Sequence, residues 1–147
     1  MSDADQAPKD VIGFLDFYLV KKAPVQLPDQ AREWIVKWGP WITVVLLALT
    51  LPLLLIVLGI GTVMVPFGGY YYAPGFGLAA VFVVVHFALM VMALPGLFAR
   101  KMSGWRLMFY AEIAALLESL FYGAIVQGLI WALIGFYILF QIRNKYR

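Results

Sequence analysis

The chain has no cysteine, a single histidine and few charged residues. Among its 147 residues are 11 Lys and Arg and 8 Asp and Glu, so only 13% are charged. Without cysteine there can be no disulfide, thiolate metal site or cysteine nucleophile. One histidine cannot form a multi-histidine metal site within one chain. The HExxH, GxSxG and Walker patterns are also absent, so we expect no enzymatic activity, no catalytic residue, no cofactor and no metal.

Apolar residues are in large excess instead. They make up 64% of the chain, and the mean hydropathy is +0.90. A soluble domain is nearer half apolar and a quarter charged, so this composition indicates lipid as the surrounding solvent. The net charge of +3 does not indicate nucleic acid, because the basic residues flank apolar segments, where they contact lipid headgroups and set topology.

The apolar segments predict an all-α, polytopic membrane protein with a four-helix transmembrane domain over residues 41–147. The tract from Leu107 to Ile142 would form a helix of ~54 Å, much longer than a bilayer needs, so it must fold back, and Tyr122-Gly123 is the natural break. A Gly- and Pro-rich loop, residues 66–77, and a basic connection with Ser103-Gly104 as its turn separate the other spans. The expected spans are residues 41–65, 78–98, 105–122 and 124–142.

Residues 1–40 are expected to form a cytoplasmic tail with two short interfacial helices. The first, within residues 10–22, is too short to span a bilayer. It either lies at the membrane interface or packs on its own bundle. The second covers residues 30–38, where Glu33 and Lys37 are spaced to pair. No cleavable signal peptide is apparent, so the first span is expected to direct insertion. The face expected to be apolar in the first helix holds Val11, Phe14, Leu15, Tyr18 and Leu19.

The distribution of Lys and Arg predicts orientation. Basic residues occur in residues 21–37, 100–106 and 143–147, whereas the two other loops have none. The positive-inside rule therefore places both termini in the cytoplasm. Aromatic residues near the ends of the first span are expected to anchor it at the two interfaces, although a quinone or headgroup site built from the tryptophans is an alternative. These anchors are Trp34, Trp38, Trp41, Tyr70, Tyr71 and Tyr72.

Four polar side chains within the spans form a candidate intramembrane site: His86, Glu112, Glu118 and Gln127. Counted from the outer ends of the spans, His86 lies ~12 Å deep and Glu112 ~15 Å deep, so these two can pair. Glu118 at ~6 Å and Gln127 at ~5 Å are an equally plausible pair. The two glutamates project ~120° apart on their helix and do not form a paired-carboxylate site. These residues either serve a proton or cation path or are structural.

Small residues recur at four-residue spacing on the last two spans. We expect these two faces to pack closely against each other, with homodimerisation as the alternative. The faces are Ala111, Ala115 and Ser119 on the third span and Ala124, Gly128 and Ala132 on the fourth.

Four stretches give the chain a resemblance to a group of small, uncharacterised bacterial four-span membrane proteins. They are Trp34–Trp41 (WIVKWGPW), Leu94–Phe98 (LPGLF), Gly104–Tyr110 (GWRLMFY) and Leu139–Tyr146 (LFQIRNKY). The resemblance implies the same topology and the bacterial inner membrane, and it implies no activity.

The sequence therefore predicts a non-enzymatic integral membrane protein, acting as an accessory, scaffold or lipid-contacting subunit. Its partners would be membrane lipids and a membrane protein or a second copy of the chain. The alternative is a small proton- or cation-linked transporter or channel that uses His86, Glu112 and Glu118.

Overall fold

The computed structural model describes residues 10–57, 64–65, 69–70, 78–121 and 123–147. Within them the chain is almost entirely helical. A short antiparallel ladder, β1 (Met64–Val65) with β2 (Gly69–Tyr70), pairs Met64 with Tyr70. The helices are α1 (Val11–Asp16), which continues as the π-helical η2 (Phe17–Lys21), α2 (Asp29–Val57), α3 (Leu78–Phe98), α4 (Met102–Phe121), α5 (Ile125–Gln141) and the 3-10 helix η3 (Arg143–Lys145).

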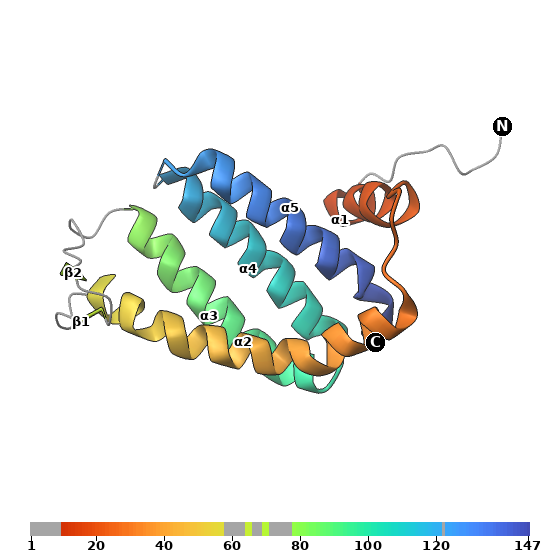
Figure 1. Cartoon of the computed structure of the whole chain (residues 1–147), viewed down its shortest axis with the longest axis horizontal. Helices are drawn as coiled ribbons and strands as arrows, with labels where there is room; N and C mark the ends of the chain where they lie inside the picture. Colours follow the sequence, from red (N-terminus) through yellow and green to blue (C-terminus); the bar gives the residue numbers. More distant parts are fainter. Residues whose placement is uncertain (1–9, 58–63, 66–68, 71–77, 122) are drawn as a thin grey trace.

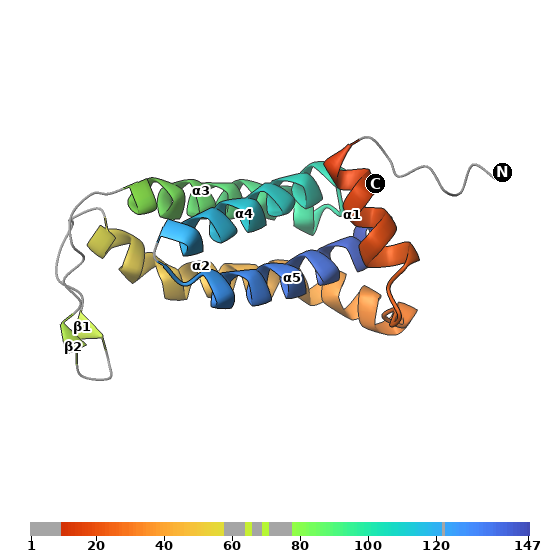
Figure 2. The same cartoon turned by 90° about the horizontal axis from the view of Figure 1, so that it is seen from above.

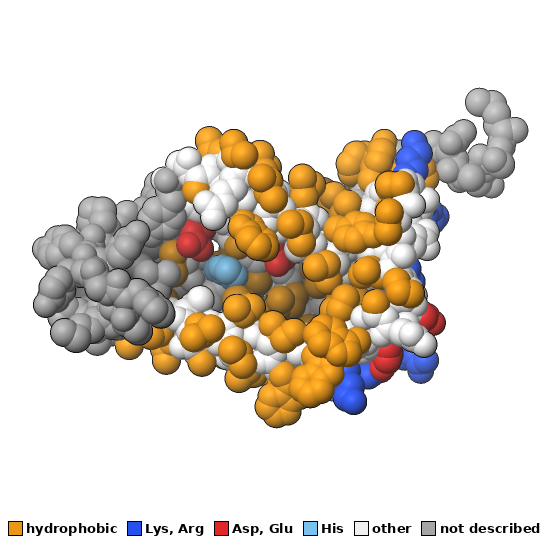
Figure 3. Space-filling view, in the orientation of Figure 1, with side chains coloured by type: hydrophobic (Ala, Val, Ile, Leu, Met, Phe, Trp, Pro, Cys, Tyr) orange, Lys and Arg blue, Asp and Glu red, His pale blue; other side chains and the backbone are white. Residues whose placement is uncertain are grey.

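The four long helices form a two-layer bundle. Figures 1 and 2 show α3 and α4 side by side in one layer and α2 and α5 in the other. Helix α1 lies at the same end of the bundle as the C-terminus, and its continuation η2 contacts α5 (Figures 1 and 2). We call this the basic end, because Lys and Arg side chains gather there (Figure 3). The opposite end, at the turn between α4 and α5, we call the cavity end.

Three helical segments are long and apolar enough to cross a membrane: Asp29–Pro52, Val81–Phe98 and Ile125–Lys145. Large apolar side chains cover their outer surfaces, as the space-filling view illustrates (Figure 3). Leu49 and Val126, for example, are 70% and 73% exposed. A surface of this kind is stable against lipid rather than water.

Helix α2 joins two elements that the sequence suggested were separate. The expected interfacial helix over residues 30–38 and the first span form one helix that passes through Pro40 and Pro52. Proline removes one backbone donor without ending a helix when nearby groups satisfy the remaining carbonyls. Pro40 and Pro52 remove the amide donors that the Val36 and Ala48 carbonyls would otherwise accept from, whereas the hydroxyls of Thr43 and Thr50 donate to other carbonyls of the same helix, at Gly39 and Leu46.

The α3–α4 hairpin turns earlier than expected. Helix α3 continues through Pro95 to Phe98, and the turn lies at Ala99–Lys101, where Arg100 has a φ of 52°. Ser103 and Gly104 are therefore helical and do not form the turn. Gly104 meets Gly96 so closely that a Cβ on either would strike the other's backbone. This contact fixes where the two helices cross.

The α4–α5 hairpin follows the expectation. It turns at Gly123, whose φ of 73° is readily adopted by glycine. The Ser119 side chain occupies the space beside Gly128, and Ala111 and Ala132 are buried. Ser119 and Gly128, one from each predicted small-residue face, are thus in contact, but α4 packs more extensively on α3 than on α5, and Ala115 and Ala124 line a cavity between the helices.

A compact apolar core lies at the basic end. Trp105 is 1% exposed, stacks on Phe109, and donates its indole N–H to the Leu139 carbonyl at 2.8 Å. This hydrogen bond stabilises the core, because burying an indole N–H without an acceptor costs free energy. The buried members of this core are Val36, Ala93, Leu97, Trp105, Phe109, Leu139, Phe140, Ile142 and Tyr146.

The α1–η2 segment packs on the bundle through part of the face that the sequence suggested. Ile12, Leu15, Leu19 and Val20 pack against the core. The other members of the expected apolar face, Val11, Phe14 and Tyr18, are 68%, 45% and 46% exposed. The π-helical turns begin only at Phe17, so they can redirect Tyr18 but do not account for the exposure of Val11 and Phe14, which lie on α1.

Candidate functional site

A cavity of about 400 Å³ lies between the two helix layers, toward the cavity end. All four long helices contribute to its wall. Figure 3 shows it as a hollow between α2 and α5, in which acidic side chains flank the pale-blue histidine. All four polar residues of the predicted intramembrane site, His86, Glu112, Glu118 and Gln127, line this cavity, together with Thr50 and Ser119. The sequence could not show this convergence, because the four come from three different helices.

His86 on α3 pairs with Glu118 on α4. The His86 Nδ1 and the Glu118 Oε2 are 3.6 Å apart, and both side chains are about a quarter to a third exposed, at 30% and 25%. The predicted pairs, His86 with Glu112 and Glu118 with Gln127, are thus replaced. The crossing of α3 and α4 at Gly96 and Gly104 sets their relative height, and that height brings His86 within reach of Glu118.

Glu112 has different surroundings. Its carboxylate lies against Gly135 on α5, at a position where a Cβ would come within 2.6 Å of one oxygen. In the described part of the chain, no Lys or Arg forms an ion pair with it, and no hydrogen bond to it is found. The two glutamates thus point to different neighbours, Glu118 to α3 and Glu112 to α5, in agreement with their angular separation. Both still face one cavity, which makes Glu112 available to a ligand there.

Three further polar groups complete the lining. Ser119 donates its hydroxyl to the Leu116 carbonyl at 2.7 Å, and Thr50 donates to backbone carbonyls of its own helix. Gln127 is exposed and lies at the rim. Within the described ranges, no three His, Asp or Glu side chains gather closely enough to hold a metal ion. The cavity therefore offers carboxylates, an imidazole and hydroxyl oxygens to a polar or cationic group.

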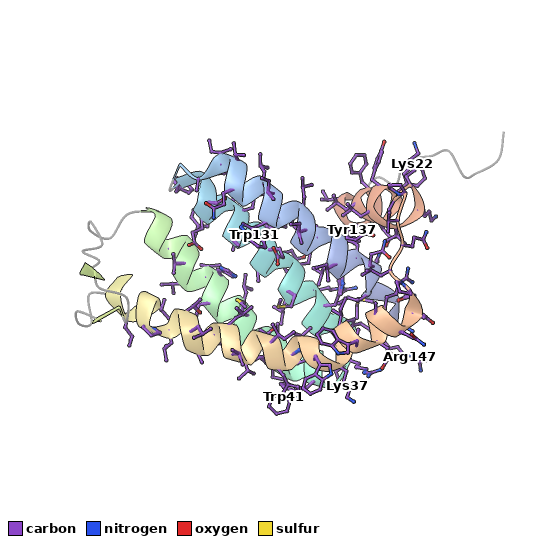
Figure 4. All side chains as sticks on the ribbon, in the orientation of Figure 1. Lys22, Lys37, Trp41, Trp131, Tyr137 and Arg147 are labelled. Carbon is purple, nitrogen blue, oxygen red and sulfur yellow. The ribbon has the colours of Figure 1, made fainter. Side chains whose placement is uncertain are left out.

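The predicted interfacial anchors fall partly within the described residues. Trp34, Trp38 and Trp41 lie on α2 near the basic end and are 57%, 46% and 58% exposed. Figure 4 shows Trp41 pointing away from the bundle, close to Lys37. Tyr71 and Tyr72 lie outside the described residues, and Tyr70 forms part of β2.

A polar network at the basic end was not predicted. Gln141 is 1% exposed; its amide oxygen accepts from Arg32 at 2.9 Å, and its amide nitrogen donates to the Leu19 carbonyl at 3.0 Å. Gln141 thus ties η2 and α2 to α5. The only sequence signal for this role is an uncharged amide at the end of an apolar tract, which equally suits an interfacial position.

Ion pairs extend this network. Glu33 pairs with Arg100 rather than with Lys37, because the α3–α4 turn brings Arg100 beside α2. Lys145 pairs with Asp29 at 3.2 Å. Between them lies a depression of about 690 Å³, and Lys101, Arg100, Lys145 and Arg147 provide its basic lining. Arg147 is held there by two backbone hydrogen bonds to the α3–α4 turn, at Arg100 and Met102.

Comparisons of the chain with family models, with curated proteins and with solved structures find no match. The residues of the two sites are therefore the basis for the function proposed below.

Proposed function

We propose that this chain is a small, non-enzymatic integral membrane protein that binds a cation in its central cavity, as a proton- or cation-linked transporter or channel does. The observation that supports this most is the convergence of His86, Glu112 and Glu118 on one cavity. Ionisable groups are costly inside a bilayer, and those that face a shared cavity mark a substrate or ion path by default. The accessory subunit expected from the sequence is kept below as a second candidate, because convergent polar groups favour a cation path.

The proposed topology has four spans. Three segments already have the required length and hydropathy. Helix α4 is less apolar, but its 20 residues reach ~30 Å, enough to cross the hydrocarbon core. Its two glutamates face the cavity, and its neighbours α3 and α5 flank it. A helix shielded in this way can carry carboxylates across a membrane.

We place the basic end in the cytoplasm and the protein in a bacterial inner membrane. The clustering of Lys and Arg at that end supports the orientation (Figure 3). Figure 4 places Lys22, Lys37 and Arg147 toward this same end. The exposed Val11, Phe14 and Tyr18 of α1 and η2 are suited to insertion among lipid headgroups, which retains an interfacial role for this segment.

The test is flux through reconstituted liposomes. Wild type is compared with the double variant Glu112→Gln/Glu118→Gln under a proton gradient and under a potassium gradient. Glu33→Gln is the matched control, because it makes the same change at the basic end. We expect flux in wild type and in the control, and its loss in the double variant. No flux in wild type, or equal flux in all three, contradicts the proposal.

A second candidate, an accessory or lipid-contacting subunit, is favoured by the basic depression at the other end. Asp29 and Glu33 also line it and pair with Lys145 and Arg100, which leaves Lys101 and Arg147 to meet the phosphate of an anionic headgroup. Purification in mild detergent separates the candidates. A stoichiometric protein partner together with no flux in wild type favours the subunit, whereas flux from the purified chain, alone or as a homo-oligomer, favours transport.

A further inference from the structure

The cavity differs in one respect from a path for a bare ion, and that is its size. At about 400 Å³ it holds many times the ~30 Å³ that one water occupies, and it falls within the range of small-molecule pockets. A proton or a monatomic ion needs no such space. If the proposed cation-binding function is correct, the cavity is large enough for a cation with an organic body.

The charge of the lining specifies the sign of the ligand. Glu112 and Glu118 contribute two carboxylates, and His86 is the only group in the described lining that can become positive. No Lys or Arg lines the cavity among those residues. One imidazole cannot neutralise two carboxylates, and His86 pairs with Glu118, so Glu112 can accept a further positive group. An anionic ligand would face a lining with more acidic than basic groups.

The rest of the wall is apolar and partly aromatic. Phe87 and Met90 come from α3, Leu54 from α2 and Trp131 from α5. Trp131 is 64% exposed at the opening, where its ring can lie against either a cation or an apolar group. Such a wall favours a ligand that carries its own apolar group, because a small hydrated ion would gain nothing from these side chains.

The opening lies at the side of the bundle. Figure 3 shows the hollow between α2 and α5, and residues of α3 and α4, which form the other layer of the bundle (Figure 2), line the rest of the cavity. The surrounding outer surfaces of α2 and α5 are apolar, so in the proposed topology the opening faces lipid. A ligand that partitions into the bilayer can therefore enter without first passing through water.

We propose that this cavity binds an amphipathic organic ammonium ion that enters from the bilayer between α2 and α5. Its positive nitrogen lies beside Glu112, and its apolar group packs against Phe87, Met90 and Trp131. This inference rests on the proposed cation-binding function and names the class of substrate.

The test uses three matched probes with the full chain in lipid nanodiscs, by calorimetric titration corrected with empty nanodiscs. Benzyltrimethylammonium carries both the charge and an aromatic group. Tetramethylammonium keeps the charge alone, and neopentylbenzene keeps the shape with carbon in place of the nitrogen. We expect the first probe to bind at least about tenfold more tightly than either of the others, because each lacks one of the two interactions.

The variants then locate the site. Glu112→Gln should weaken benzyltrimethylammonium binding by about tenfold or more, whereas Glu33→Gln should change it less than about twofold. Ala115→Phe fills the cavity and leaves both carboxylates in place, so it should also abolish binding. It provides a second test if Glu112→Gln fails to fold, and helical circular dichroism reports folding for each variant.

Several results overturn this inference. They are equal binding of the neutral probe, equal binding of tetramethylammonium, or unchanged binding in a folded Glu112→Gln or Ala115→Phe variant. Proton or potassium flux that needs the glutamates, without binding of the aromatic cation, rejects the ligand class and keeps the proposed function. Binding of that cation with no flux of protons, potassium or the probe itself keeps the site and rejects transport.

Discussion

The Glu112 carboxylate on α4 occupies the space that a side chain at Gly135 on α5 would need. The two residues are therefore matched across the helix pair. Two helical turns nearer to the loop between α4 and α5, Ser119 and Gly128 repeat this arrangement. In both cases a polar side chain of α4 fits beside a glycine of α5, which lets the helices approach closely.

Gly135→Ala should displace the Glu112 carboxylate while preserving its charge. The displaced group is the end of a flexible side chain, so the expected cost is about 1 kcal/mol of unfolding free energy. Cation flux should fall because the carboxylate moves. Thermal unfolding in detergent measures the first effect and liposome flux the second.

Gly39→Ala is the control, since nothing lies within 4 Å of the added Cβ, and it should be neutral or stabilising by up to ~1 kcal/mol. Unchanged flux in Gly135→Ala would show that the exact placement of Glu112 is unimportant.

Gly104→Ala should be much more harmful than Gly135→Ala. The added Cβ meets the backbone of Gly96 and Leu97, which cannot rotate away. We expect a loss of about 3 kcal/mol or more, and a shift of α3 relative to α4. The rings of Phe82 on α3 and Phe121 on α4 stack in the native protein. Because the chain has no native cysteine, disulfide crosslinking of a Phe82→Cys/Phe121→Cys variant reports whether α3 and α4 keep this register. Wild-type crosslinking in Gly104→Ala would argue against this crossing point.

Gln141→Leu should release the N-terminal segment. It leaves the Arg32 guanidinium and the Leu19 carbonyl without their buried partner, which costs about 1–3 kcal/mol. Trypsin should then cut more rapidly after Lys21 or Lys22. Gln127→Leu is the matched control on the same helix, because this amide is exposed at the other end. Equal trypsin cleavage in the two variants contradicts a tethering role for Gln141.

Tyr146 predicts a specific loss of stability in alkali. Burial raises its pKa above the ordinary value for a phenol, and nearby Arg100 opposes part of that rise. The unfolded chain therefore loses this proton at a lower pH than the folded chain. Stability from the neutral phenol is complete below about pH 10 and declines as the pH rises through the folded pKa. Melting curves from about pH 8 to about pH 12 should decline less steeply for Tyr146→Phe than for wild type. Tyr110→Phe is the control, since Tyr110 is exposed, and its stability should fall with pH as steeply as that of wild type.

The proposed topology predicts opposite compartments for two loop positions. A reporter at Tyr71 should be located outside the cytoplasm, and one at Lys101 should be located inside it. Four spans with a cytoplasmic N-terminus require this result, because one span separates the two positions. The same compartment for both would contradict the arrangement of the bundle in a membrane.

Helix limits were predictable wherever local chemistry sets them. The second span was expected over residues 78–98 and α3 covers the same residues, because an apolar tract there ends at Arg100 and Lys101. Gly123 likewise marks the α4–α5 turn. The helix over residues 30–38 and the first span were expected to be separate, whereas α2 is one helix that continues through Pro40.

Contacts between helices were much less predictable. The pairing of His86 with Glu118 depends on where α3 crosses α4, and that depends on Gly96 and Gly104, whose contact no periodicity reveals. The cavity depends further on the separation of α2 from α5. The residues of the candidate site could thus be identified from the sequence, whereas their convergence on one cavity could not.

Most of the described hydrogen bonds and ion pairs between distant parts of the chain, here called polar ties, lie at the basic end. At the basic end, Gln141, the ion pairs of Asp29 and Glu33, and the backbone of Arg147 join the N-terminal segment, α2, α5 and the α3–α4 turn. In the described part of the cavity end, the corresponding tie is the His86–Glu118 pair, within the α3–α4 layer. Spreading α2 from α5 there breaks none of the described polar ties at the basic end. In the proposed topology, a ligand that separates α2 from α5 at the cavity end would therefore displace apolar contacts and leave the polar contacts of the basic end in place.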